Sequence, residues 1–538
     1  MNRPFIFLLI VLFSLTISSC QSDTAENEEY QEQVDSSFSD KKVVMVMIDS
    51  IMDHTLNHVI EEGDAPALQF LKENGQYYPD LIAPVPSMSV TIESTILTGE
   101  MPDQHHVPGL AWYDAEADRI VNYGTTWQFW LKNDFTASTY DVLYRLNNEH
   151  LNKDVTTIFE DLDEEGLTSA SINLVVYRGN HSHQLKVPLF LDEVTDLPET
   201  VETKGPNVLA LGRVTKPEII EDDDNLSDSL IKRIGFQDEY SMEVAQQLIE
   251  QDDQPDFTFI FFPENDRETH KEGPSYTGGV VDADQYLQDI LNSYDSWEQA
   301  IEENIFIVFG DHGQDQMLEK EEDIAIDLEN LYAEYSLSKL GEPVSQGEVA
   351  FGINQRSAYV YDVQNAGLLP ELAEHSLQDS RIDFAAWQEG DEVHVISPDI
   401  EGSLQFNVKG EWVDRYDQSW SIEGNEQILD LYMSGNEVVY SDYPDVLNHL
   451  ITALNSHDTP KIMLAAKPGH SFRAEGITIH EAGGEHGGLH KHDILASMIV
   501  TGTNQTPEYL RMVDFKEYIL SLLTDNSEPI NDETSLNE

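Results

Sequence analysis

Acidic and histidine side chains stand close to the ends of several apolar runs in this sequence. The set comprises Asp49, Asp266, His270, Asp311, His312 and His486. Carboxylates and imidazoles are suitable oxygen and nitrogen ligands for zinc or manganese ions. A single Asp after a strand is often only a helix N-cap, so the argument depends on the whole set. A fold that gathered these residues, which spread from position 49 to position 486, would create a metal centre.

Four continuous apolar runs of strand length are expected to form the sheet that positions these side chains. They are residues 43–48 (VVMVMI), 257–262 (FTFIFF), 305–309 (IFIVF) and 494–500 (ILASMIV). Strands that are apolar at almost every position are typical of a sheet buried on both faces. Residues 53–74 and 241–251 have helical composition. We therefore predict an α/β fold with a mostly parallel central sheet and helices on both faces, which binds ligands at the carboxyl ends of its strands.

A hydroxyl-rich segment, residues 86–99 (PSMSVTIESTILTG), is the expected source of a nucleophile. It begins with a proline and contains a helix-like stretch that ends at Gly99. A hydroxyl at a helix N-terminus gains from the backbone N–H groups and the positive end of the helix dipole. A bound metal ion would lower its pKa further. Most hydroxyls of this segment are expected only to cap and pack the helix.

The first twenty residues predict export. Arg3 is followed by the apolar run 5–17, which is too short to span a bilayer comfortably and ends in Ser18-Ser19-Cys20. The small residues before Cys20 resemble the lipobox of bacterial lipoproteins, and Cys20 is the only cysteine in the chain. We expect an extracytoplasmic protein, lipid-anchored to the cell membrane through Cys20. The alternative is an ordinary secretory signal with an incidental cysteine.

The charge balance limits the partners. Twenty-nine basic and 101 acidic residues give a formal net charge of −72 and a pI near 4.2. Such a surface repels nucleic acid, so no nucleic acid polymer is expected as a partner, and we interpret the charge as a solubility feature. Phosphate substrates are repelled as well. A local positive centre is therefore needed, and metal ions would supply it.

The chain divides into five expected parts. These are a signal peptide (1–20), a flexible tether (21–41), a catalytic domain (42–345 and 441–523), an inserted α+β lobe (346–440) and a polar tail (524–538). The lobe is expected from alternating runs such as residues 358–361 and 393–396. Residues 115–235 mix short strands and turns, and we expect them to build a wall of the substrate cleft.

Several short blocks resemble one family. They are Ile48-Asp49, residues 87–99 with Pro102 and His105, residues 266–274 (DRETHKEGP), residues 310–313 (GDHG) and residues 484–488 (GEHGG). Together they resemble the alkaline phosphatase superfamily, specifically its type I phosphodiesterase and nucleotide pyrophosphatase branch. The order of the blocks covers about residues 43–502.

The resemblance implies two metal sites and a nucleophile. Asp49, Asp311 and His312 would hold one divalent ion together with the nucleophile, and Asp266, His270 and His486 would hold the other. The family's nucleophile falls on Ser89, with Thr91 as the second choice. His490 is a rival to His486. The ions are expected to be Zn²⁺, with Mn²⁺ as an alternative.

Some positions depart from the family's pattern. Thr91-Ile92 stand where many members have Pro-Asn, Glu93 stands where a His is common, and Thr269 replaces the glycine before His270. All the expected metal ligands are kept. The resemblance therefore implies the metal chemistry but not the recognition of a particular substrate.

The expected reaction is hydrolysis of a small-molecule phosphate ester. Ser89 would attack phosphorus in line, and water activated at the second ion would hydrolyse the phosphoryl-Ser89 intermediate. The nucleophile segment contains no arginine, which favours a phosphodiester or pyrophosphate over a monoester with its additional charge. A phosphomonoesterase and a transferase of phosphoglycerol-type headgroups use the same centre and remain alternatives. A non-catalytic ligand-binding lipoprotein is the alternative from a different class.

Overall fold

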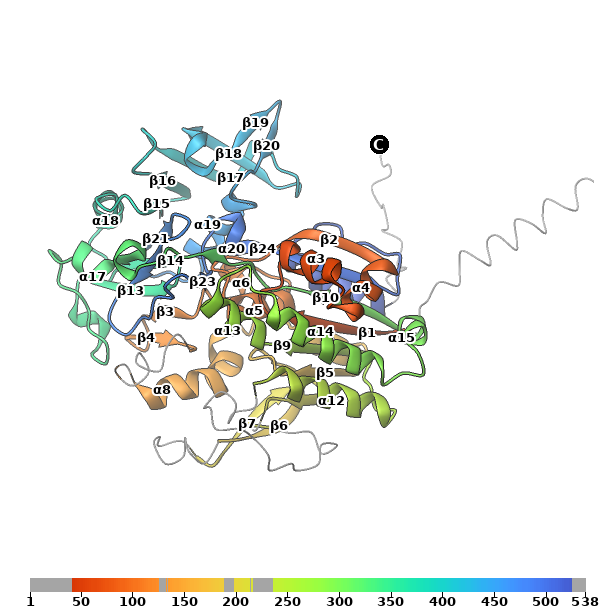
Figure 1. Cartoon of the computed structure of the whole chain (residues 1–538). Coiled ribbons are helices and arrows are strands. Elements are labelled where there is room, and N and C mark those ends of the chain that lie inside the picture. Colours follow the sequence, from red (N-terminus) through yellow and green to blue (C-terminus); the bar gives the residue numbers. More distant parts are fainter. Residues whose placement is uncertain are drawn as a thin grey trace, which may run out of the picture. The chain divides into compact units, whose positions relative to one another are not determined.

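The computed structural model describes residues 41–124, 132, 134–187, 198–212, 214–215 and 236–524 (Figure 1). The predicted signal peptide with Cys20, nearly all of the predicted tether and nearly all of the predicted tail lie outside these residues. Residues 41–522 form one compact unit. Within the described ranges, no helix is long and apolar enough to cross a membrane.

A seven-stranded sheet forms the centre of this unit, with the strand order β2-β24-β10-β1-β9-β5-β8. Its members are β1 (Lys42–Ile48), β2 (Gly75–Ile82), β5 (Ser169–Ile172), β8 (Val208–Ala210), β9 (Phe257–Phe262), β10 (Asn304–Phe309) and β24 (Leu495–Thr501). Strands β10, β1, β9, β5 and β8 run parallel to one another. The continuous apolar runs therefore became the buried central strands, as predicted.

Strand β24 runs antiparallel to β10. Phe309 pairs with Met498, and the N–H of Gly310 donates to the carbonyl of Ser497 over 2.9 Å. The beginning of β24 consequently lies beside the end of β10. This orientation explains how His486, which precedes a strand, can reach the edge where Asp49 and Asp311 follow theirs.

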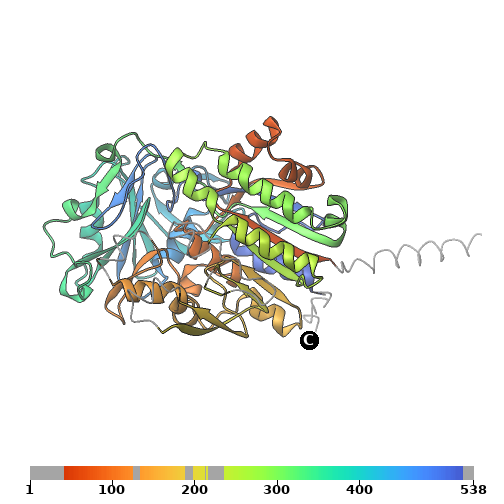
Figure 2. The ribbon, with the colours of Figure 1, turned by 60° about the horizontal axis from the view of Figure 1, so that its bottom comes forward.

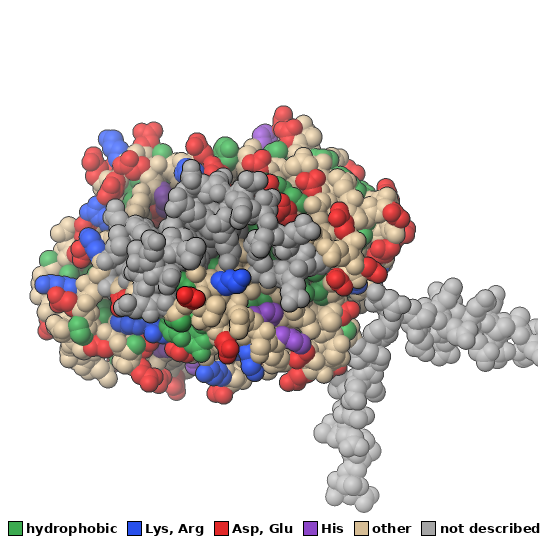
Figure 3. Space-filling view, turned by 90° about the horizontal axis from the view of Figure 1, so that it is seen from below, with side chains coloured by type: hydrophobic (Ala, Val, Ile, Leu, Met, Phe, Trp, Pro, Cys, Tyr) green, Lys and Arg blue, Asp and Glu red, His purple; other side chains and the backbone are tan. Residues whose placement is uncertain are grey.

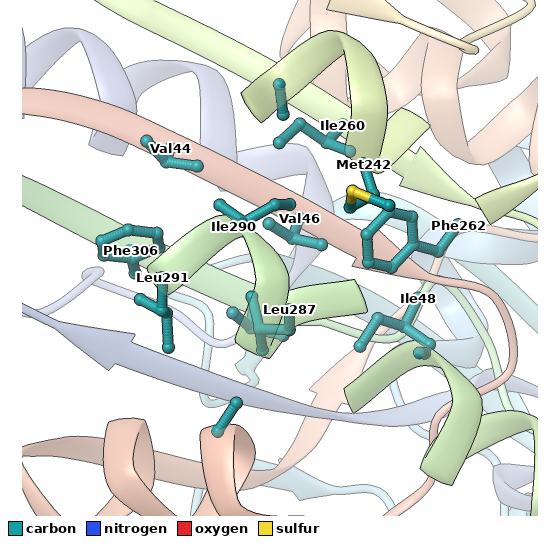
Figure 4. Close-up of a cluster of buried hydrophobic side chains, with 14 of the residues drawn as sticks. Val44, Val46, Ile48, Met242, Ile260, Phe262, Leu287, Ile290, Leu291 and Phe306 are labelled. Carbon is teal, nitrogen blue, oxygen red and sulfur yellow. The ribbon is translucent and has the colours of Figure 1, made fainter. Parts of the chain in front are cut away.

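Helices cover both faces of the sheet, which confirms the predicted fold class. On one face lie α3 (Asp53–Glu62), α4 (Pro66–Glu73), α12 (Asp238–Glu250) and α14 (Gly278–Leu291), with α12 and α14 side by side (Figure 2). Val46 and Ile48 of β1 pack there against Leu287 and Ile290 of α14 (Figure 4). On the other face lie α5 (Ser89–Thr98), α9 (Ile158–Glu164) and α21 (Phe515–Leu523), where the ring of Phe515 contacts Phe309.

A separate sheet of nine strands confirms the second, β-rich region. Its strands are β13 (Val349–Asn354), β14 (Ser357–Asp362), β15 (Ile382–Glu389), β16 (Glu392–Ile396), β17 (Leu404–Val413), β18 (Ser419–Gly424), β19 (Tyr432–Ser434), β20 (Glu437–Val439) and β21 (Lys461–Ala466). Strand β21 lies beyond residue 440, where the sequence placed the end of the lobe, and it pairs with β14 and β15 in the middle of the sheet. Helix α18 (Leu369–Ser376) packs on this sheet through Leu372 and Ala373.

Residues 115–235, which were expected to form a wall of the substrate cleft, supply strands to the central sheet as well as separate elements. The separate elements are β4 (Arg119–Asn122), α8 (Phe135–Tyr140), a π-helical segment η1 (Asp141–His150), β6 (His181–Lys186) and β7 (Thr200–Gly205). The strands supplied to the central sheet are β5 and β8. On the face in Figure 3, acidic side chains are spread over the described surface, with lysine and arginine between them. This distribution suits the interpretation of the charge as a solubility feature.

Candidate active site

Ser89 is the first residue of α5, which follows Pro86-Ser87-Met88 and ends at Gly99 in the left-handed conformation (φ 69°). The remaining residues of α5 are buried, but Ser89 is only half-buried. Its Oγ donates to Oδ2 of Asp311 over 3.3 Å. The Oγ of Thr91, by contrast, is buried and has no hydrogen-bond partner among the described residues. The structure thus brings Ser89, and not Thr91, to the acidic residues.

Asp49, Asp311 and His312 form one group at the carboxyl ends of two adjacent strands. Asp49 follows β1, while Asp311 and His312 follow β10 after a single glycine. Nε2 of His312 lies 3.4 Å from Oδ1 of Asp49 and 3.5 Å from Oδ2 of Asp311. All three side chains are buried. Their ligand atoms lie close enough together to hold one metal ion.

The distances in this group match the edges of a coordination tetrahedron. Zinc bonds of 2.0–2.2 Å to nitrogen and oxygen place neighbouring ligand atoms about 3.3–3.6 Å apart. The three distances among Ser89, Asp49, Asp311 and His312 fall between 3.3 and 3.5 Å. Oδ1 of Asp49 and Nε2 of His312 are moreover buried without a hydrogen-bond partner in the described part of the chain. These residues therefore fit an ion that is held together with the Ser89 hydroxyl.

The second group surrounds Asp266 on α13 (Glu264–Glu272), which follows β9. His270 lies one helical turn further on, and its Nε2 is 3.2 Å from Oδ2 of Asp266. Nε2 of His486 is 3.7 Å from Oδ1 of Asp266. A set of mutually close ligand atoms also links Asp266 and His486 with His312, whose ring stacks on that of His486 at 3.7 Å. The two groups are therefore neighbours and meet at His312.

All three imidazoles present the same nitrogen to these groups. Nδ1 of His270 donates to the carbonyl of Gly484 (2.7 Å), that of His312 to the carbonyl of Gly313 (3.0 Å), and that of His486 to the carbonyl of Ser87 (2.6 Å). A carbonyl oxygen can only accept, so each Nδ1 carries a proton, and in the neutral imidazole the lone pair is on Nε2. Backbone carbonyls commonly orient metal-binding histidines in this way. The arrangement therefore prepares three Nε2 atoms as ligands.

The electrostatics of the groups call for positive charge. Burial and the neighbouring Asp311 raise the pKa of Asp49 well above its usual range, and burial raises the pKa of Asp311 to about 6. Burial lowers the pKa of His312 to about 4 and, with the nearby His312, that of His486 to about 3. Burial also opposes the charge on His270, but Asp266 outweighs it and raises that pKa to about 9. Two buried carboxylates beside two neutral imidazoles suit the binding of a divalent cation.

His490 does not join either group. Its ring contacts those of Tyr443 and His492, and its Nδ1 accepts from the N–H of His492 over 3.2 Å. The structure thus brings His486 to Asp266, while the rival His490 is engaged elsewhere.

Two of the departures from the family's pattern have a structural reason. Glu93 is fully buried, accepts from the N–H of Val176 over 2.7 Å, and so ties α5 to the segment after β5. Its burial raises its pKa well above the usual range. Thr269 lies inside α13, which keeps Asp266 and His270 on one helix face without the glycine. Neither change removes an expected ligand.

Supporting residues of the site were missed by the sequence analysis. Oε1 of Gln355, in the turn between β13 and β14, accepts from the N–H of His486 over 3.0 Å, and the N–H of Arg356 donates to the carbonyl of His486 over 3.1 Å. No local signal in the sequence connects this turn of the second sheet with the GEHGG block. Ser50, by contrast, directly follows Asp49, and Gln314 comes two residues after His312, so their position in the sequence could have suggested a role.

Comparison with known proteins identifies the class. A family model described as "Type I phosphodiesterase / nucleotide pyrophosphatase" matches residues 43–489. The chain belongs to this family, a branch of the alkaline phosphatase superfamily, and is a phosphoric ester hydrolase. The predicted resemblance is thereby confirmed. No curated protein matches the chain in a sequence search.

Solved structures with the same fold include three structures of one protein, two from mouse and one from human. The murine ectonucleotide pyrophosphatase/phosphodiesterase 5, as an inactive variant in complex with AMP, has 12% identity and a TM-score of 0.52. A second structure of the murine protein has 13% identity and a TM-score of 0.52. The human protein has 13% identity and a TM-score of 0.50. Each match covers 90% of this chain and 95% of the other. At this identity the likeness shows the fold alone.

Proposed function

We propose that the chain hydrolyses phosphodiester or pyrophosphate bonds of a small-molecule substrate, with Ser89 as the nucleophile and two divalent metal ions as cofactors. Asp49, Asp311 and His312 would hold one ion beside Ser89, and Asp266, His270 and His486 would hold the other. Zn²⁺ is the first choice and Mn²⁺ the second. The observation that carries the proposal is that the three distances from Ser89 to Asp311, from Asp311 to His312 and from His312 to Asp49 each have the length expected between neighbouring ligands of one ion.

The protein's own residues set up an in-line displacement. Ser89 stands at the N-terminus of α5, where free backbone N–H groups and the helix dipole favour an anionic oxygen. Its hydroxyl donates to Asp311, which orients it and can take its proton. When bound, the two ions would lower the pKa of the hydroxyl and neutralise charge on the phosphoryl oxygens.

The reaction proceeds in two displacement steps. Ser89 Oγ gives its proton to Asp311 and forms a bond to phosphorus, while the bond to the departing oxygen breaks and that oxygen leaves with a proton. The intermediate is a phosphate ester of Ser89 that keeps the other group of the diester or pyrophosphate. Water attacks that phosphorus, the bond to Oγ breaks, and the hydroxyl is restored as the phosphate product leaves.

The charges around the site favour a diester or pyrophosphate. The largest electrostatic effects on Asp49, Asp266 and Asp311 come from one another, from Asp238 and from the histidines, with no lysine or arginine among them. The ions would then supply positive charge that these three carboxylates do not receive from a basic side chain, and a diester brings less charge to the attacked phosphorus than a monoester. Phosphomonoester hydrolysis and headgroup transfer use the same residues and are the alternatives. Nucleotide esters are suitable first substrates, since a protein of this fold has been observed in complex with AMP.

The test compares wild type, Ser89→Ala and Thr91→Ala on bis(4-nitrophenyl) phosphate and 4-nitrophenyl phosphate, with metal content measured for each. We expect wild type to prefer the diester, Ser89→Ala to lose at least about 10³-fold in kcat with both ions retained, and Thr91→Ala to stay active. Turnover by Ser89→Ala at the wild-type rate would refute the role of Ser89. A wild type without turnover on either ester or on nucleotide esters would favour the non-catalytic ligand-binding lipoprotein.

We also propose that the protein is exported and anchored through a lipid on Cys20. The proposal is supported by the apolar run 5–17, the small residues before Cys20 and the absence of any other cysteine. Labelled palmitate should be incorporated by wild type and not by Cys20→Ser. Equal labelling of both proteins would contradict the anchor.

A further inference from the structure

Ser50, directly after Asp49, has a strained backbone at the centre of the site. Its φ is 58°, in the left-handed region, and it is fully buried. Residues other than glycine adopt this conformation at an energetic cost, and such strain persists where the surroundings fix it. Glycine would avoid the cost. Unlike glycine, Ser50 carries a hydroxyl, and its hydrogen bonds can offset this cost.

The hydroxyl of Ser50 joins the two ligand groups. Its Oγ lies 3.1 Å from Oδ1 of Asp266, 3.1 Å from Nδ1 of His312 and 3.1 Å from Nε2 of Gln314. The N–H of Ser50 donates to Oδ1 of Asp311 over 3.0 Å. One residue thus contacts Asp266 of the second group and both Asp311 and His312 of the first.

The directions of these hydrogen bonds are consistent with one another. Nδ1 of His312 carries the proton, since it also donates to the carbonyl of Gly313. Gln314 donates through its amide nitrogen. Ser50 Oγ therefore accepts from His312 and Gln314 and keeps its own proton for Asp266, which uses the full capacity of a hydroxyl.

Asp266 is held in a single orientation by this network. Its Oδ1 accepts from both Ser50 and Gln314, and its Oδ2 is left facing Nε2 of His270 at 3.2 Å. Gln314 reaches this position beside Gly484, where a Cβ atom would collide with its side-chain oxygen. Oδ2 is consequently the oxygen of Asp266 that is available as a ligand beside His270.

We propose that Ser50 is a positioning residue that couples the two ligand groups, because its hydroxyl fixes Asp266 relative to His312. It raises the affinity of the Asp266 group for its ion without touching the ion or the substrate. The inference rests on the proposed function in one respect, namely that the two groups bind ions. Its physical basis is that outer hydrogen-bond partners orient ligands and typically change metal affinity 10- to 100-fold.

The test titrates Zn²⁺ into the full-length chain after chelation, and compares wild type with Ser50→Gly and Ser50→Ala. Asp266→Asn and Asp49→Asn serve as references that identify which binding step belongs to which group. We expect both Ser50 variants to bind the ion of the Asp266 group about 10- to 100-fold more weakly. Because glycine relieves the strained φ, metal-free Ser50→Gly should melt no lower than Ser50→Ala.

Asn173 offers a matched control. It is also buried with a positive φ (64°), follows β5, which is separated from β1 by β9, and donates to Oγ of Ser241 over 2.8 Å. Asn173→Gly should therefore change the melting temperature but leave both affinities for Zn²⁺ at the wild-type values.

The outcomes separate the inference from the proposed function. Wild-type affinities in Ser50→Gly and Ser50→Ala would overturn the role of Ser50 while the metal sites stand. A loss of affinity in Ser50→Ala but not in Ser50→Gly would overturn it too, since backbone strain would then be the cause. A wild type that binds no Zn²⁺ would overturn both the inference and the proposed metal centre.

Discussion

Replacing Arg356 with methionine should destabilise the metal-free protein by about 3–5 kcal/mol. Arg356 is fully buried, and its Nη1 lies 2.7 Å from Oδ2 of Asp315 and 3.1 Å from Oδ2 of Asp493. Removal of one partner of a buried ion pair leaves the other charge uncompensated, which accounts for the magnitude. Here the arginine pairs with two buried carboxylates, so the loss of stability should lie within this range of about 3–5 kcal/mol.

The cost should depend on pH in a defined direction. Burial raises the pKa of Asp493 to about 7 even though Arg356 opposes the shift. A carboxyl with a raised pKa favours the folded state at low pH, and this contribution is lost as pH rises through the folded-state pKa. Without Arg356 the pKa rises further. The difference between wild type and Arg356→Met should therefore be larger at pH 8.5 than at pH 6.

Urea unfolding at these two pH values is the assay, with Arg381→Met as the matched control. Arg381 pairs with Asp379 at 2.6 Å, but both side chains are partly exposed, so its loss should cost about 0–1 kcal/mol. Arg356→Met combined with Asp493→Leu should recover part of the stability. The reasoning is refuted if Arg356→Met costs no more than Arg381→Met, or if its cost falls as pH rises.

Three further predictions concern other buried groups. Burial lowers the pKa of Lys461 to about 7, so the stability that wild type owes to the neutral amine is present above about pH 10.5 and is lost as pH falls toward 7. In urea, the amount by which the unfolding free energy of Lys461→Met exceeds that of wild type should therefore shrink as pH rises from 7 to 10. A constant difference would contradict this. Burial raises the pKa of Glu93 and so favours its protonated form, which an amide resembles, and Glu93→Gln should melt close to wild type in calorimetry. Glu93→Ala leaves the Val176 N–H without its acceptor and should lose about 1–3 kcal/mol, and equal melting of the two variants would be inconsistent with this hydrogen bond. Chelation should lower the melting temperature, because Asp49 and Asp311 lose the compensating charge. Zn²⁺ at about 100 times Kd should then restore about 2.7 kcal/mol of stability per site. A melting temperature that changes with neither treatment would argue against bound ions.

The sequence predicted those parts of the fold and site that depend on local pattern. Continuous apolar runs are distinctive of strands buried on both faces, so β1, β9 and β10 were found within one residue of their ends. Since these strands are parallel and adjacent, the residues that follow them had to lie at one edge. The convergence of Asp49, Asp266 and Asp311 follows from that geometry alone.

Other features depend on pairing between distant segments and were not predictable from local pattern. Nothing in residues 494–500 specifies that β24 runs antiparallel to β10. The return of β21 to the middle of the second sheet is a long-range pairing of the same kind. The contact of Gln355 and Arg356 with His486 follows from how the two sheets pack, and the left-handed conformation of Ser50 contradicts the usual preference of serine.

A crystal structure with Zn²⁺ and orthovanadate, phased to locate the metals by anomalous scattering, tests the central claim most directly. We expect two zinc peaks about 4 Å apart, one within reach of Asp49, Asp311 and His312 and the other of Asp266, His270 and His486, with vanadium bonded to Oγ of Ser89. Zinc bound elsewhere, or vanadium in the site without a bond to Ser89, would contradict it.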